Sequence, residues 1–110
     1  MPFQYSDSEY IKLNRKILNW EWYDDVNTRL LFIHCLLRAN WMETSWHGVK
    51  LKRGEFITSL ASLAEETNLS VRNVRTALKH LKATGEVTSR KYAKFRIISI
   101  KNWDLYQQSD

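Results

Sequence analysis

The chain has 110 residues, 44% of them hydrophobic and 26% charged, and Lys and Arg outnumber Asp and Glu by 17 to 12, for a formal net charge of +5. These values predict one globular domain with a single core and argue against intrinsic disorder. The single cysteine, Cys35, rules out an internal disulfide, and no apolar run approaches the roughly 18 residues of a membrane span. We therefore expect an intracellular protein without a membrane segment.

The positive charge is concentrated in the C-terminal part of the chain. Residues 1–69 contain 8 Lys and Arg and 9 Asp and Glu, whereas residues 70–110 contain 9 and 3. A protein with a polyanion-binding face is expected to separate its charge in this way.

The N-terminal part predicts little regular structure. Residues 1–9 are expected to be a flexible N-terminus, residues 10–13 alternate apolar and polar as in a short strand, and residues 16–20 suit a brief helical turn. The neighbouring aromatic residues Trp20, Trp22 and Tyr23 need burial. Either the domain's own helices or a second subunit covers them, and the first interpretation is favoured.

A long helix is predicted from Asp24 and Asp25, which suit its N-terminal cap, to about Ala39. Residues 30–37 are apolar nearly all round, so this helix should be central to the core or covered on both sides. Within it, Cys35 is expected to be a small core residue and His34 a core or boundary histidine.

Residues 46–51 and 55–58 predict two short extended pieces around a turn at residues 52–54 that contains Gly54, and they lead into Ser59 as the cap of the next helix. Residues 60–85 then show a helical apolar period that is interrupted once, at residues 67–70. Ser70 suits the cap of a second helix, and Gly85 suits its left-handed end. The stretch predicts a helix, a tight turn and a helix.

The second of these helices would expose cations. With Val71, Val74, Leu78 and Leu81 turned inward, its outer face holds Arg72, Thr76, Lys79 and Ala83, flanked by Asn73 and His80 on one side and Arg75 and Lys82 on the other. Arg, Lys, Asn and Thr are the side chains that contact base edges and phosphates in the DNA major groove. A helix face that is charged for solubility alone is the alternative.

A β-hairpin is predicted after Gly85, from residues 86–91 and 95–100 with a turn at residues 92–94. Four cations, Arg90, Lys91, Lys94 and Arg96, are expected to cluster at its tip, where a phosphate backbone would offset their mutual repulsion. No nucleophile–base pair, paired carboxylates or metal-ligand spacing is present in the sequence, so we expect a protein that is not an enzyme and needs no metal or cofactor.

Three helices followed by a basic hairpin are the winged-helix arrangement, and five segments carry a more specific resemblance. They are residues 10–13 (YIKL), 54–60 (GEFITSL), 69–78 (LSVRNVRTAL), 84–87 (TGEV) and 102–106 (NWDLY). They resemble the amino-terminal winged-helix domain of phage replisome organisers, which are DnaD-like replication initiation proteins of phages and prophages in low-GC Gram-positive bacteria.

The resemblance implies an α+β fold of the winged helix-turn-helix type over residues 10–106, with a three-helix core, a small antiparallel hairpin wing and an extra N-terminal segment. It also implies binding to origin DNA in the cytoplasm of a bacterial host, self-association as a dimer or larger oligomer, and recruitment of the host helicase through a helicase loader. A helical C-terminal domain follows in such proteins, so residues 107–110 are expected to be a polar tail or the start of a linker.

The DNA contacts expected from the exposed helix face and the hairpin come from Arg72, Asn73, Arg75, Thr76, Lys79, Arg90, Lys91, Lys94 and Arg96. Self-association is expected to use Tyr10, Trp20, Trp22 and Tyr23. Two alternatives stay open: a transcriptional regulator that reads an operator with the same helix, and a protein-interaction module without DNA binding whose contact surface includes Trp41 and Trp46.

Overall fold

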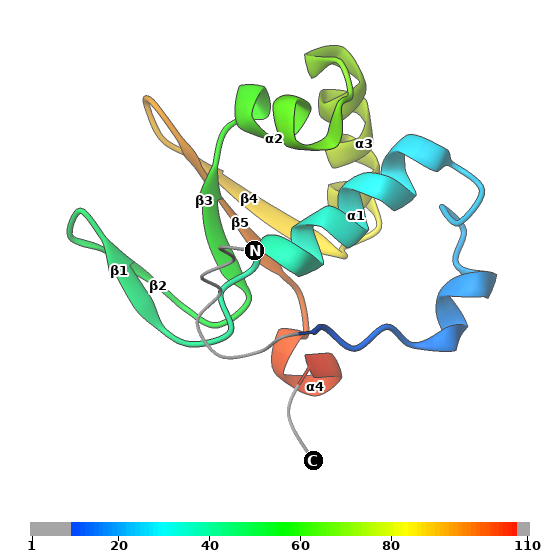
Figure 1. Ribbon diagram of the computed structural model, residues 1–110, viewed down its shortest axis with the longest axis horizontal. Helices are drawn as coiled ribbons and strands as arrows, with labels where there is room; N and C mark the ends of the chain where they lie inside the picture. Colours follow the sequence, from blue (N-terminus) through cyan, green and yellow to red (C-terminus); the bar gives the residue numbers. More distant parts are fainter. Residues whose placement is uncertain (1–9, 108–110) are drawn as a thin grey trace.

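The computed structural model describes residues 10–107, which form an α+β domain of four α-helices and two antiparallel sheets (Figure 1). The helices are α1 (Val26–Arg38), α2 (Leu60–Thr67), α3 (Val71–Ala83) and α4 (Trp103–Gln107), and the 3₁₀ turn η1 (Arg15–Asn19) precedes them. The strands are β1 (Thr44–Trp46) and β2 (Val49–Leu51) in one sheet, and β3 (Glu55–Thr58), β4 (Val87–Lys91) and β5 (Arg96–Ile100) in the other. The predicted α+β class is confirmed, and the arrangement is compatible with a winged helix.

Helix α1 begins and lies as predicted. The side chain of Asp25 caps it by accepting a hydrogen bond from the backbone N–H of Thr28, at 3.1 Å, and the helix contacts α2, α3 and β5. Leu31 and Cys35 are fully buried in the core. The first predicted alternative, a helix central to the core, is therefore confirmed, while Leu30 and Leu37 are exposed, so α1 is not covered on every side.

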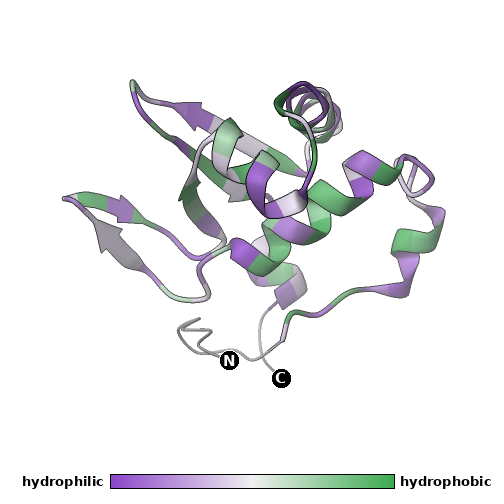
Figure 2. Cartoon of the chain, turned by 45° about the horizontal axis from the view of Figure 1, so that its top comes forward, coloured by the Kyte–Doolittle hydropathy of each residue, from purple (hydrophilic) through white to green (hydrophobic). Residues whose placement is uncertain are grey.

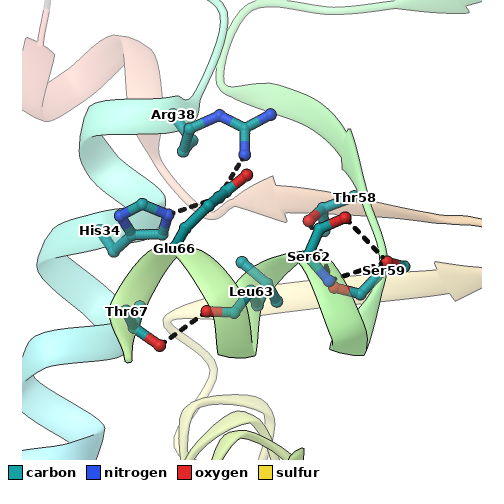
Figure 3. Close-up of polar contacts among 8 residues, drawn as sticks. All are labelled: His34, Arg38, Thr58, Ser59, Ser62, Leu63, Glu66 and Thr67. Atoms are coloured by element: carbon teal, nitrogen blue, oxygen red, sulfur yellow. Dashed lines mark hydrogen bonds and ion pairs between the residues drawn. The ribbon is translucent and has the colours of Figure 1, made fainter. Parts of the chain in front are cut away.

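Helices α2 and α3 form the predicted pair. Ser59 caps α2 by accepting from the N–H of Ser62 (Figure 3), and Ser70 caps α3 by accepting from the N–H of Asn73, each at 3.0 Å. Asn68 makes the turn between the helices in the left-handed conformation, with φ 60°. Gly85, with φ 84°, follows the end of α3 as predicted.

One inward-facing residue was predicted wrongly. Val74, Leu78 and Leu81 of α3 are buried, but Val71 is 40% exposed. Val71 is the first residue of the helix, and a helical side chain leans back toward the N-terminus. The turn that lies there leaves Val71 partly open to solvent.

Helices α1 and α2 are joined by a small polar cluster (Figure 3). His34 Nε2 and Arg38 Nη1 of α1 lie 2.7 and 2.6 Å from the same Glu66 oxygen of α2. Partial burial acts to raise the pKa of Glu66, but the hydrogen bonds from His34 and Arg38 outweigh it and lower the pKa below its ordinary value of 4.5. His34 is thus the boundary histidine that was predicted.

This lowered pKa predicts a pH-dependent contribution to stability. A carboxyl group whose pKa is depressed by folding stabilises the folded state above its unfolded pKa, and that stabilisation is lost as the pH falls through the folded pKa. We expect Glu66→Gln to cost about 0.5–1 kcal/mol at neutral pH, since the pair is partly exposed, and to cost almost nothing near pH 3. Urea unfolding at the two pH values measures this, and an equal cost at both would refute it.

The larger sheet has the order β3-β5-β4, with all pairs antiparallel. The β4–β5 hairpin is the predicted one, and its turn is closed by a hydrogen bond of 2.8 Å from the N–H of Tyr92 to the carbonyl of Phe95. The smaller hairpin turns at His47 and Gly48, both with positive φ, inside the first predicted extended piece, so this turn was not predicted. The turn predicted at residues 52–54 does join β2 to β3, but these two strands lie in different sheets. Figure 2 shows hydrophobic and hydrophilic residues alternating along the helices and strands, as expected of elements that each bury one face.

The ends of the described chain are tied together by Gln107. Its side-chain amide accepts from the N–H of Lys12 and donates to the carbonyl of Lys12, both at 2.7 Å, and Gln107 is only 2% exposed. The strand predicted at residues 10–13 is therefore wrong, because the backbone groups of Lys12 bond to a side chain instead of a neighbouring strand. Gln107 belongs to the folded domain and not to a polar tail, while the predicted flexible residues 1–9 lie outside the described part.

We expect Gln107→Ala to lower the free energy of unfolding by about 1–3 kcal/mol, because it leaves the amide and carbonyl of Lys12 without this partner. Leu105→Ala on the exposed side of the same helix is the control and should change stability little. Urea unfolding measures the cost, and hydrogen exchange at Lys12 locates it. Unchanged stability together with a protected Lys12 amide would show that the two hydrogen bonds between Gln107 and Lys12 do not stabilise the fold.

Candidate nucleic-acid interface

Helix α3 presents five of the predicted DNA-binding residues on its solvent side. All five are exposed, while the opposite face of the helix is buried through Val74, Ala77, Leu78 and Leu81. They are Arg72, Asn73, Arg75, Thr76 and Lys79, which we call the α3 face. The 3.6-residue period brings these side chains together, since residues three and four apart share one side of a helix.

The cations of the α3 face have no internal partner. Among residues 10–107, no ion pair or side-chain hydrogen bond involves Arg72, Arg75 or Lys79. Two carboxylates of the helical layer bind other groups: Glu66 binds α1, and Asp25 Oδ2 lies 3.3 Å from His80 Nδ1. The positive charge of this face is therefore available to an external anion.

His80 does not flank the α3 face as predicted. Its ring stacks on Trp22 with a centroid distance of 4.2 Å, and its Nδ1 lies 2.9 Å from Thr28 Oγ1 of α1. The indole N–H of Trp22 in turn donates to Thr84 Oγ1, at 2.9 Å, just past the end of α3. These contacts fix α3 against α1 and the N-terminal segment, which holds the α3 face in place.

Of the four predicted cations on the β4–β5 hairpin, two have no ion-pair partner and two bind groups within the domain. Lys91 and Lys94 are exposed and, within the described chain, take part in no ion pair. Arg90 Nη1 instead donates to Glu55 Oε2 at 3.1 Å, and hydrogen bonding to Tyr92 and Glu55 raises its pKa above the ordinary value. Arg96 Nη1 donates to Ser89 Oγ at 3.1 Å.

Arg90 is thus the counter-charge of a buried carboxylate. Glu55 is 4% exposed, and its second oxygen accepts from the N–H of Lys52 at 2.8 Å. A buried carboxylate requires such a partner. The four cations lie beside the hairpin turn as predicted, but Arg90 and Arg96 have internal partners, and Lys91 and Lys94 are the two that remain available.

The aromatic residues predicted for self-association do not form one exposed patch. Trp20 packs on Phe32 at a centroid distance of 5.0 Å, Trp22 binds α3, and Tyr23 lies under Arg29 at 5.0 Å. Tyr10 is 73% exposed. Trp20, Trp22 and Tyr23 thus pack against other residues of the same chain, which is the interpretation that the sequence favoured. Self-association remains a prediction.

The two aromatic residues of the alternative interaction surface, Trp41 and Trp46, differ in their packing. Trp41 packs edge-on against Trp103 at 5.8 Å, whereas Trp46 is exposed and contacts Phe95 of the β4–β5 turn. Sequence reasoning missed this second contact, because no local pattern connects positions so far apart in the chain.

Cys35 lies in the core, away from solvent. Burial raises the pKa of its thiol to about 12, so it is held as an unreactive neutral group. No group of three or more His, Cys, Asp or Glu residues that could hold a metal ion occurs among residues 10–107. Nor does any helix within those bounds have the length and apolar character to cross a membrane.

Comparisons of the chain with models of known protein families, with curated proteins and with solved structures find no match in any of the three.

Proposed function

We propose that this chain is a winged-helix DNA-binding domain that serves replication initiation of the phage type, without enzymatic activity. The observation that carries the proposal is the α3 face: three cations without an internal partner, beside Asn73 and Thr76, on the second helix of a helix-turn-helix pair. A face built only for solubility would be expected to include acidic residues. None of residues 71–83 is acidic.

In the proposed complex, α3 lies in the major groove. Recognition helices of this class contact base edges with their N-terminal residues. Arg72, Asn73 and Thr76 occupy the first two turns of α3, so they are assigned to base edges, and Arg75 and Lys79 to phosphates. The β4–β5 hairpin acts as the wing, whose Lys91 and Lys94 hold the flanking backbone.

The proposed complex does not use Arg90 and Arg96 as DNA contacts. Their guanidinium groups already bind Glu55 and Ser89, so recruiting them would cost internal hydrogen bonds. The role in replication, the oligomer and the helicase loader as a partner rest on the resemblance of segments such as residues 54–60 and 102–106.

The salt dependence of duplex binding tests the proposal. Five available cations (Arg72, Arg75, Lys79, Lys91 and Lys94) would release close to one counterion each, so log Kd should change with log salt with a slope of magnitude about 4–5. That slope weakens binding roughly several hundred-fold between about 50 and 200 mM salt. Fluorescence anisotropy with a labelled random duplex measures it, and an affinity that is independent of salt rules the proposal out.

A further inference from the structure

Four rings meet where the tips of the two hairpins approach each other. Trp46, at the end of β1, contacts Phe95 edge-on at a centroid distance of 5.2 Å, and Phe95 stacks on Tyr92 at 4.8 Å with an interplanar angle of 14°. His47 lies edge-on to Trp46 at 4.3 Å. We call Trp46, His47, Tyr92 and Phe95 the tip cluster.

The tip cluster is open to solvent. Trp46 is 42% and Tyr92 43% exposed, and neither belongs to the hydrophobic core, which contains Phe56 and Trp103. Large rings are normally buried, because they remove much apolar surface from water. Rings that are fixed against one another and left exposed offer flat faces to a ligand.

The charged residues within the two hairpins, residues 44–51 and 87–100, are all positive. Lys91 and Lys94 lie beside Tyr92 and Phe95 in the β4–β5 hairpin, both are exposed, and neither takes part in an ion pair within residues 10–107. Residues 44–51 and 91–96 contain no Asp or Glu. A second copy of the chain docking through the same surface would bring these lysines against one another, which disfavours self-association here.

We propose that the tip cluster stacks unpaired DNA bases, with Lys91 and Lys94 holding the phosphates between them. Exposed aromatic faces interleaved with cations are the chemistry of single-strand binding, because every base has a π-face and every linkage a negative charge. A base inside a duplex has both faces covered by its neighbours and cannot use the rings. The proposal extends the proposed function, on which it rests: the α3 face binds duplex, and the tip cluster binds a strand that opens beside it.

The test compares two labelled probes, a 20-nucleotide oligo(dT) and a blunt random duplex of about the same length, by anisotropy at one salt concentration. The double variant Trp46→Ala, Tyr92→Ala removes two exposed rings, so we expect it to weaken oligo(dT) binding by at least about 10-fold and duplex binding by less than about 2-fold. Trp46→Phe with Tyr92→Phe keeps the stacking faces and should retain oligo(dT) binding. Tyr106→Ala, which removes an exposed ring on α4, is the matched control.

The outcomes separate this proposal from the proposed function. Unchanged oligo(dT) binding in the double alanine variant, or an equal loss for both probes, overturns the role of the tip cluster. Loss of self-association by light scattering, with oligo(dT) binding intact, overturns it in favour of an interface between copies. If the wild type binds oligo(dT) through these rings but shows no salt-dependent duplex binding, the tip cluster stands and the function proposed for the α3 face fails.

Discussion

Replacing Arg72, Arg75 and Lys79 together by Glu should lower duplex affinity by at least about 100-fold at moderate salt. Each change removes a cation that has no internal partner and places a negative charge opposite a phosphate or base edge. Because the three side chains are exposed on one face of α3 and hold nothing inside the domain, we expect the free energy of unfolding to change by less than about 0.5 kcal/mol.

The control for this prediction carries the same change in net charge at another place. Arg15, Lys16 and Lys52 are exposed and form no ion pair within the described chain, so their joint replacement by Glu alters the overall field equally. We expect the control to lose less than about 10-fold, since only long-range attraction weakens. Equal losses in the two variants would mean that net charge, and not the α3 face, drives binding.

Gly54→Ala should be strongly destabilising, with a cost of about 2–5 kcal/mol. Gly54 has φ 81°, and a Cβ there would lie 2.6 Å from Cβ and 2.7 Å from Cγ of Trp103. Trp103 is buried and packs from α4 against this turn, so it cannot move aside without opening the core. Backbone strain and steric overlap therefore add.

Gly48→Ala separates the two contributions. Gly48 has nearly the same φ, 80°, but a Cβ added there would meet no atom within 4 Å. Its cost should be backbone strain alone, about 1 kcal/mol. Urea unfolding of both variants gives the difference between their losses in free energy of unfolding, which we assign to the overlap with Trp103. A difference near zero would show that Trp103 and α4 shift to accommodate the added Cβ at little cost.

Local patterns were sufficient to predict α1, α2 and α3 with their caps, whereas α4 was not predicted. The helix ends depend on hydrogen bonds and dihedral preferences of adjacent residues, as at Ser59, Ser70 and Gly85. Their roles can therefore be inferred from the residues next to them in the sequence. The same holds for the exposed residues of α3, because one helical period separates them from Val74 and Leu78. The β4–β5 hairpin followed from its β-branched runs, whereas the turn of the smaller hairpin at His47 and Gly48 was not predicted.

Contacts between distant segments could not be inferred in this way. The pairs Gly54 with Trp103, Gln107 with Lys12 and Glu55 with Arg90 join positions that are 49, 95 and 35 residues apart. No local period connects them, since they depend on how the strands and α4 come together. The error at residues 10–13 and the missed partner of Arg90 share this origin.

The position of duplex DNA on the domain tests the central claim most directly. Backbone amide NMR of the full chain, titrated with a random duplex, should show the largest shift changes at Arg72, Asn73, Arg75, Thr76 and Lys79, followed by Lys91 and Lys94, with little change in α4. Changes confined to α4 and the N-terminal segment, with the α3 amides unmoved at saturation, would contradict the account.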